Sequence, residues 1–246
     1  MNSKRFIRTP SVFIFAVGII LGTALSGIVV WGDLEASLFD ASIRGDATLT
    51  TLRCPVMMTA KEIGTASATF ENPLERPVTF TIRAHISRGY VTLMREINSK
   101  LSLAPGETQT LEWTVTPDDA AYGRLILLRV RLSAKYPLPA RDASCGILVV
   151  DLPYFSGNQI TAFTLAASLL SMVVGASLWV TTNRPLRGLA REVTRAMGVL
   201  AGSVLLAMVL GLFGNWLFGV LLLVITILLG VAIIGYFVNR SGNSPL

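Results

Sequence analysis

The feature that most restricts the fold of this chain is a run without any charged residue, from Met197 to Phe237. It is about twice as long as the ~20 apolar residues that cross a bilayer as one helix. Gly214, Asn215 and Trp216 interrupt the run near its middle, and such residues favour a turn. We therefore predict a membrane protein with a tight helical hairpin, 197–213 and 214–237, and Trp216 at the membrane interface.

Two further uncharged segments predict two more spans, at 11–31 and 158–182. The first follows a basic leader at 1–10, and as a helix it would be roughly 30 Å long at ~1.5 Å per residue. A cleaved signal peptide is the alternative, with Ala24-Leu25-Ser26 as a small-residue cleavage site. The segment is longer than the apolar core of about 7–15 residues that signal peptides have, which favours a retained anchor.

The basic residues predict the orientation of these spans. Outside 33–157 the chain has eight basic residues and one acid, Glu192, whereas 33–157 holds thirteen basic and fourteen acidic residues. By the positive-inside rule, the leader, the loop at 183–196 and the tail at 238–246 are cytoplasmic, and 32–157 lies outside. The net charge of +6 then reflects membrane topology and gives no case for nucleic-acid binding.

The segment between the first two spans has the alternation of β-strands. From Pro77 to Ser87, apolar residues at even positions alternate with polar ones, as in a strand with one face on a core. Other runs with strand character are 48–53, 63–70, 90–97, 110–116, 124–134 and 145–152, separated by turn residues. The predicted fold class is a mixed membrane protein, with an extracytoplasmic all-β, Ig-like sandwich (32–157) between one N-terminal and three C-terminal membrane helices.

Two turns in this segment carry a family resemblance. Asn72-Pro73 and the run Leu103-Ala104-Pro105-Gly106 are similar to turns of the bacterial and archaeal Ig-like modules of the CARDB and NEW3 type. The resemblance covers roughly residues 54 to 152. It implies an Ig-like fold and a role in adhesion or scaffolding, and it transfers no functional residue.

Cys54 and Cys145 are the only cysteines. Each is predicted at a strand end, near the membrane-proximal ends of an exported domain, so a disulfide is the natural pairing in an oxidising compartment. The bond would close a loop of roughly 90 residues and stabilise the domain by about 4–5 kcal/mol. Two free thiols or a metal site with so few ligands are the weaker alternatives.

Small residues predict how the first two helices pack. Gly18, Gly22 and Ser26 recur at every fourth position in the first span, and Ala167, Ser171 and Gly175 do so in the second. Such stripes permit close backbone approach. We predict antiparallel packing with Gly22 beside Ser171. A similar stripe at Ser203, Ala207 and Gly211 leaves a different pairing open.

The loop at 183–196 carries four arginines, Arg184, Arg187, Arg191 and Arg195, at steps of three and four. With Asn183 as N-cap and Pro185 at the first position, this spacing favours an amphipathic helix. Such a helix fits docking to anionic lipid or to an acidic partner. A short connector that obeys the positive-inside rule explains the same arginines.

Residues suited to catalysis or to binding a cofactor are scarce. The sole histidine, His85, is on the polar side of its predicted strand, which predicts a surface histidine. Asp118-Asp119 reads as a turn rather than a calcium site, because a calcium site needs more acids at defined spacing. We recognise no nucleotide-binding, hydrolase or zinc motif and expect no enzyme, catalytic residue, cofactor or metal.

The function that fits best is that of a structural or interaction protein. We expect an accessory or scaffold subunit of a membrane complex, with the bilayer and a protein as partners and neither nucleic acid nor a small-molecule substrate. A sensor or a transport component acting through the helices is the alternative. The four predicted spans contain no ionisable residue, whereas ion pathways usually need one.

Overall fold

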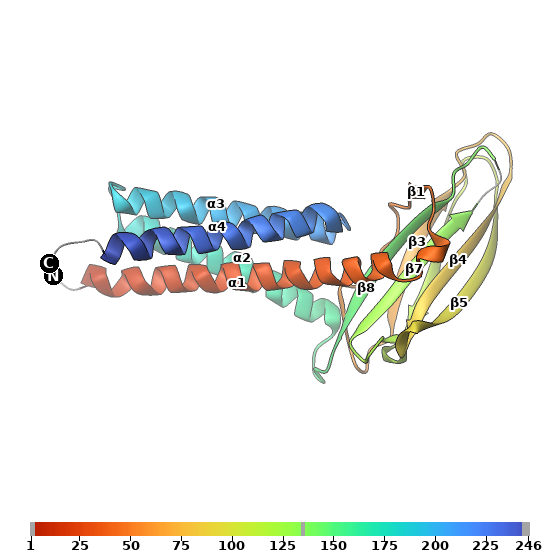
Figure 1. Ribbon diagram of the computed structural model, residues 1–246, viewed down its shortest axis with the longest axis horizontal. Helices are drawn as coiled ribbons and strands as arrows, with labels where there is room; N and C mark the ends of the chain where they lie inside the picture. The colour runs from red at the N-terminus through yellow and green to blue at the C-terminus, as the bar shows by residue number, and fades with distance from the viewer. Residues whose placement is uncertain (1–2, 134–135, 243–246) are drawn as a thin grey trace. The chain divides into compact units, whose positions relative to one another are not determined.

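The computed structural model describes residues 3–133 and 136–242, which divide into two compact units. A β domain runs from Trp31 to Thr161, and a helical unit is formed by the chain up to Val30 and from Ala162 on. Helix α1 contributes to both (Figure 1). In chain order the elements are α1 (Ser3–Leu38), η1 (Ala41–Ile43), β1 (Ala47–Thr48), β2 (Met57–Thr59), β3 (Gly64–Glu71), β4 (Val78–Arg88), β5 (Tyr90–Leu103), β6 (Thr108–Val115), η2 (Pro117–Asp119), β7 (Leu125–Ser133), β8 (Arg141–Val150), α2 (Gly157–Thr182), α3 (Leu189–Leu212) and α4 (Trp216–Gly242).

Four helices are long and apolar enough to cross a membrane: Pro10–Leu38, Gly157–Thr182, Leu189–Leu212 and Trp216–Tyr236. They expose large apolar side chains such as Phe163, Leu170, Leu221 and Ile234. Water disfavours such surfaces, whereas lipid tails do not. The mixed composition, with four apolar helices and a β domain, fits a membrane protein.

Inside the helical unit, α1 and α2 approach closely at glycines. A Cβ added to Gly18 would lie 2.7 Å from the Met172 backbone nitrogen, and one added to Gly22 would lie 2.7 Å from the Ser168 hydroxyl. The Ser168 hydroxyl donates a hydrogen bond of 2.8 Å to the Gly18 carbonyl. A Cβ on Gly175 would lie 2.5 Å from the Phe15 nitrogen.

The contact face of α2 differs from the predicted one. Ser168 rather than Ser171 lies against Gly22, and Ala167 is exposed. A strict step of four residues turns 40° too far at each step on a helix with ~3.6 residues per turn. A contact face therefore mixes steps of three and four, as the buried residues of α1 do at Ser11, Phe15, Gly18, Gly22, Leu25, Ser26 and Val29.

The β domain consists of two sheets around one core. A six-stranded sheet has the order β1-β8-β7-β4-β5, with β2 also paired to β8, and β3 and β6 form the second sheet. As predicted, β4 directs Val78, Phe80, Ile82, Ala84 and Ile86 into the core. Trp113 of β6 lies in the same core.

The end of α1 covers part of the other face of the larger sheet. Ala36 and Phe39 pack on Leu127 of β7. His85 and Ser87 of β4 are consequently buried on this face, and the prediction of a surface His85 is wrong. The cause is that α1 continues as a helix to Leu38, well past the predicted end of the span at Trp31.

Candidate functional site

A polar cluster holds the segment that follows α1. Arg129 of β7 is only 3% exposed and donates from Nη1 to the carbonyl oxygens of Phe39 (2.7 Å) and Asp40 (3.2 Å). Its Nε donates to Asp142 Oδ2 of β8 at 3.0 Å, and its Nη2 lies 3.0 Å from the same oxygen. Asp40 has a φ of 41°, a left-handed conformation that Asp tolerates better than most residues and that turns the chain after the helix. The buried guanidinium is thus matched by a carboxylate and two carbonyls.

His85 of β4 lies between two carboxylates. Its Nδ1 contacts Asp40 Oδ2, and its Nε2 lies 3.6 Å from Glu96 Oε1 of β5. Burial favours a higher pKa for Asp40, but hydrogen bonds from Ser42 and His85 and the charge of His85 outweigh it and hold the pKa below its ordinary value. The pKa of Glu96 is also lowered, chiefly by a hydrogen bond from Asn98. Asp40, His85, Arg129 and Asp142 are called the α1 clamp below.

The geometry of the α1 clamp suits a structural role. A His–Asp pair activates a nucleophile only when the nucleophile lies at the other ring nitrogen. Here the side chain facing Nε2 is Glu96, which has no proton to give up when ionised. Within residues 3–133 and 136–242, no three His, Cys, Asp or Glu side chains are grouped to hold a metal ion.

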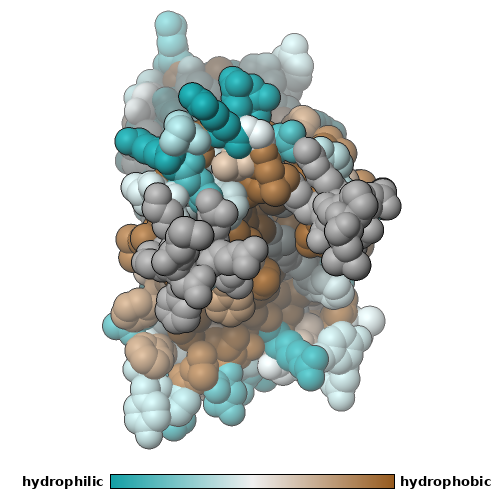
Figure 2. Space-filling view, turned by 90° about the vertical axis from the view of Figure 1, so that its left-hand side faces the viewer, coloured by the Kyte–Doolittle hydropathy of each residue, from teal (hydrophilic) through white to brown (hydrophobic). Residues whose placement is uncertain are grey.

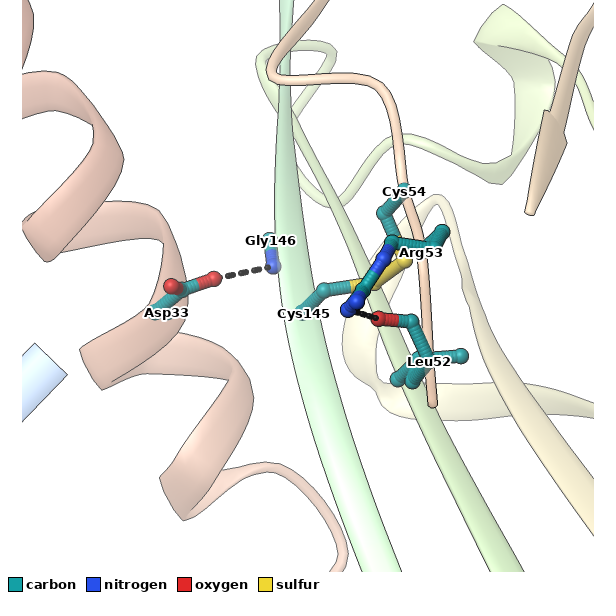
Figure 3. The surroundings of a disulfide bond; sticks show 6 residues. All are labelled: Asp33, Leu52, Arg53, Cys54, Cys145 and Gly146. Carbon is teal, nitrogen blue, oxygen red and sulfur yellow. Dashed lines mark hydrogen bonds between the residues drawn. A yellow bond between two sulfur atoms is a disulfide. The ribbon is translucent and has the colours of Figure 1, made fainter. Parts of the chain in front are cut away.

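A second attachment of α1 lies beside the disulfide. The Gly146 amide of β8 donates to Asp33 Oδ1 at 3.4 Å (Figure 3). A Cβ on Gly32 would lie 3.1 Å from the Gly146 carbonyl oxygen, and one on Gly146 would overlap the Gly32 carbonyl. Glycine at Gly146 therefore allows α1 to lie this close to the strand, and a Cβ at Gly32 would make only a tight contact.

The disulfide joins Cys54 to Cys145, with Cα atoms 6.5 Å apart and 91 residues of sequence separation. Cys145 lies inside β8, opposite Leu128, and not at a strand end as predicted. The bond therefore fastens the segment before β2 to the middle of the strand that α1 contacts at the neighbouring Gly146 (Figure 3).

The first residue of α2 is also held by the β domain. The Gly157 amide donates to Glu62 Oε2 at 2.8 Å, and the same oxygen accepts the Thr59 amide at 3.1 Å. A Cβ on Gly157 would overlap the Met57 carbonyl. Both partners of Gly157 come from β2 or from the turn that follows it, almost a hundred residues earlier in the chain, and no local pattern in the sequence indicates this contact.

The four predicted arginines lie at the end of the helical unit where α2 is joined to α3. All four are exposed, but α3 begins at Leu189, so Arg184 and Arg187 precede it and only Arg191 and Arg195 share its first turns. Asn183 caps the preceding helix instead, with its side-chain amide donating to the Trp179 carbonyl at 2.8 Å. The predicted helix start at Pro185 is therefore wrong.

An open groove of about 360 Å³ lies beside these arginines. Its lining residues are Glu192, Arg195, Ala196, Ala232, Ile233 and Tyr236. The Tyr236 hydroxyl donates to Glu192 Oε2 at 3.3 Å. Figure 2 views this end of the unit and shows hydrophilic side chains around a hydrophobic area.

Comparison with known proteins gives a likeness for the β domain. The CARDB domain of the PF1109 protein from Pyrococcus furiosus, solved with two metal ions, is 16% identical over 44% of this chain and 90% of its own, with a TM-score of 0.34. A Bacteroides uniformis β-glucuronidase is 15% identical over 39% of this chain but only 12% of its own length, with a TM-score of 0.30. No family model matches the chain, and no curated protein does.

Proposed function

We propose that this protein is a membrane-anchored interaction protein, an accessory or scaffold subunit whose β domain binds a protein partner outside the cytoplasm. The four apolar helices support the anchoring, and the arginines at the α2–α3 connection support a cytoplasmic position for that end. The observation that carries the proposal is the edge formed by β5.

Strand β5 is long and lies at the end of the larger sheet. It covers 14 residues and, within the described chain, pairs with β4 alone. From Met94 to Leu103 its register with β4 is continuous, so its outer side presents backbone donors and acceptors. Such an edge is a template for a strand from another chain.

The usual protection of an edge is weak here. Arg95 reaches the other sheet, where Nη2 donates to the Thr114 carbonyl at 2.8 Å and to Asp119 at 3.0 Å. Glu96 accepts from Asn98 at 2.8 Å and faces His85. These charges are engaged inside the domain, which leaves Lys100, exposed on β5, as the remaining charged side chain of the strand.

The test is site-specific photo-crosslinking in native membranes. A benzoylphenylalanine at Lys100 or Asn98 should give one reproducible protein adduct, because a strand added to β5 passes within reach of both positions. The control is Arg83, which is exposed on β4 but lies between two paired strands. Equal adducts at Arg83, or none at Lys100 and Asn98 in folded protein, would refute binding at this edge.

A further inference from the structure

The start of α2 fixes the depth of one part of the β domain. Helix α2 has 26 residues, and at ~1.5 Å per residue it is about 39 Å long. The hydrocarbon core is ~30 Å thick, and with both headgroup layers the bilayer is about 40–45 Å thick. A centred α2 therefore places Gly157 in a headgroup layer.

The turn between β2 and β3 must lie at the same depth. The Gly157 amide is bonded to the Glu62 carboxylate, and the Gly157 backbone contacts Met57. The residues on either side of Glu62 are Lys61 and Ile63, and both are exposed. Ile63 is 71% exposed, a large fraction for a β-branched apolar side chain.

The connection from β8 to α2 adds an aromatic side chain at this depth. Tyr154 is 89% exposed and lies three residues before Gly157. Tyrosine prefers the membrane interface, where its ring meets apolar groups and its hydroxyl stays hydrated. Lysine can extend its stem along apolar groups and place its ammonium at phosphate level.

We propose that Lys61, Ile63 and Tyr154 form a lipid-contact surface, with the β domain seated in the phospholipid headgroup layer around the start of α2. Lys61 binds lipid phosphate, and Ile63 and Tyr154 enter the glycerol region. The inference rests on the proposed membrane anchoring of α2. The occupant is phospholipid because Lys61 and Ile63 flank Glu62, which is bonded to the start of a membrane span, and Tyr154 precedes that span by three residues.

Spin-label accessibility in vesicles of phosphatidylethanolamine and phosphatidylglycerol tests this. Nitroxides are attached to single cysteines at Ile63 and Tyr154, and collision with oxygen is compared with collision with a water-soluble nickel chelate. The matched control is Tyr136, which is 90% exposed in the turn between β7 and β8, at the other end of β8 from Val150. We expect an oxygen-to-nickel ratio several-fold higher at Ile63 and Tyr154 than at Tyr136.

Two outcomes would overturn the inference. Ratios like that of Tyr136 would place the surface in water, and exclusion of both probes would mean that protein covers it. A label at Leu170, which is 64% exposed on α2, separates this failure from that of the anchoring. If Leu170 reports lipid while Ile63 and Tyr154 do not, only the lipid-contact surface is refuted, whereas a Leu170 label in water refutes the anchoring itself.

Discussion

Replacing Arg129 with Met should destabilise the β domain strongly. The substitution removes the partner of Asp142 and leaves the carbonyls of Phe39 and Asp40 without their donor. Breaking a buried ion pair from one side costs about 3–5 kcal/mol, because the remaining charge stays buried. At roughly 4 °C per kcal/mol for a domain of this size, the midpoint of thermal unfolding should fall by about 12–20 °C.

The assay is thermal unfolding of the full chain in detergent, followed by the fluorescence of Trp113. This residue is 3% exposed in the core of the β domain. The other tryptophans, Trp31, Trp179 and Trp216, are replaced by Phe in every variant so that the signal reports this core alone.

Arg131 provides the matched control. It lies two residues further along β7 on the same face, and its Nε is buried without a hydrogen-bond partner. Arg131→Met should lower the midpoint by less than a third as much as Arg129→Met. The double variant Arg129→Met, Asp142→Leu should recover part of the loss, because no carboxylate is left unpaired. Equal effects of the two arginine variants, or additive effects in the double variant, would refute the account of the α1 clamp.

Three other predictions follow from the described contacts. Replacing Cys54 and Cys145 with Ala should cost about 4–5 kcal/mol of β-domain stability on the chain-entropy model, measured by the same fluorescence assay. The pKa of Asp40 is lower in the folded state than its ordinary value of 3.8. The stability that the Asp40 carboxylate contributes is therefore present above pH 3.8 and is lost as the pH falls through the pKa of the folded state. Asp40→Asn should flatten the acid limb of the curve of stability against pH, below about pH 4. Gly18→Leu should disrupt α1–α2 packing, whereas Gly198→Leu, with open space around its Cβ, should not, as measured by the far-UV circular dichroism of the full chain in detergent during thermal unfolding.

The sequence predicts the strands better than it predicts their surroundings. The alternation in β4 correctly predicts which side chains enter the core, because the period of two is a local property of the strand. It cannot show that part of the opposite face is covered as well. That cover comes from Ala36 and Phe39, which follow the charged residues Asp33 and Glu35. Charges that end a membrane span need not end a helix, and this difference explains the error on His85.

For a related reason, the sequence does not predict where the end of α1 and the start of α2 contact the β strands. Gly146 and Gly157 are each required by a backbone from a distant segment, and a single glycine in a sequence gives no sign of its neighbour. The cysteine pair was predictable because only two cysteines exist. The position of Cys145 inside β8 was not, since it depends on where Cys54 comes to lie.

The strand order also determines when the β domain can fold during synthesis. Strand β8 is the last to be made, yet it pairs with β1, β2 and β7. Ala47 must therefore wait for Arg141, and Met57 for Leu148. Contacts this distant in sequence form slowly, and β1 and β2 stay without their sheet partner until the segment next to α2 has been synthesised. Completion of the sheet is thus coupled to the synthesis of the segment that leads directly into the second apolar helix.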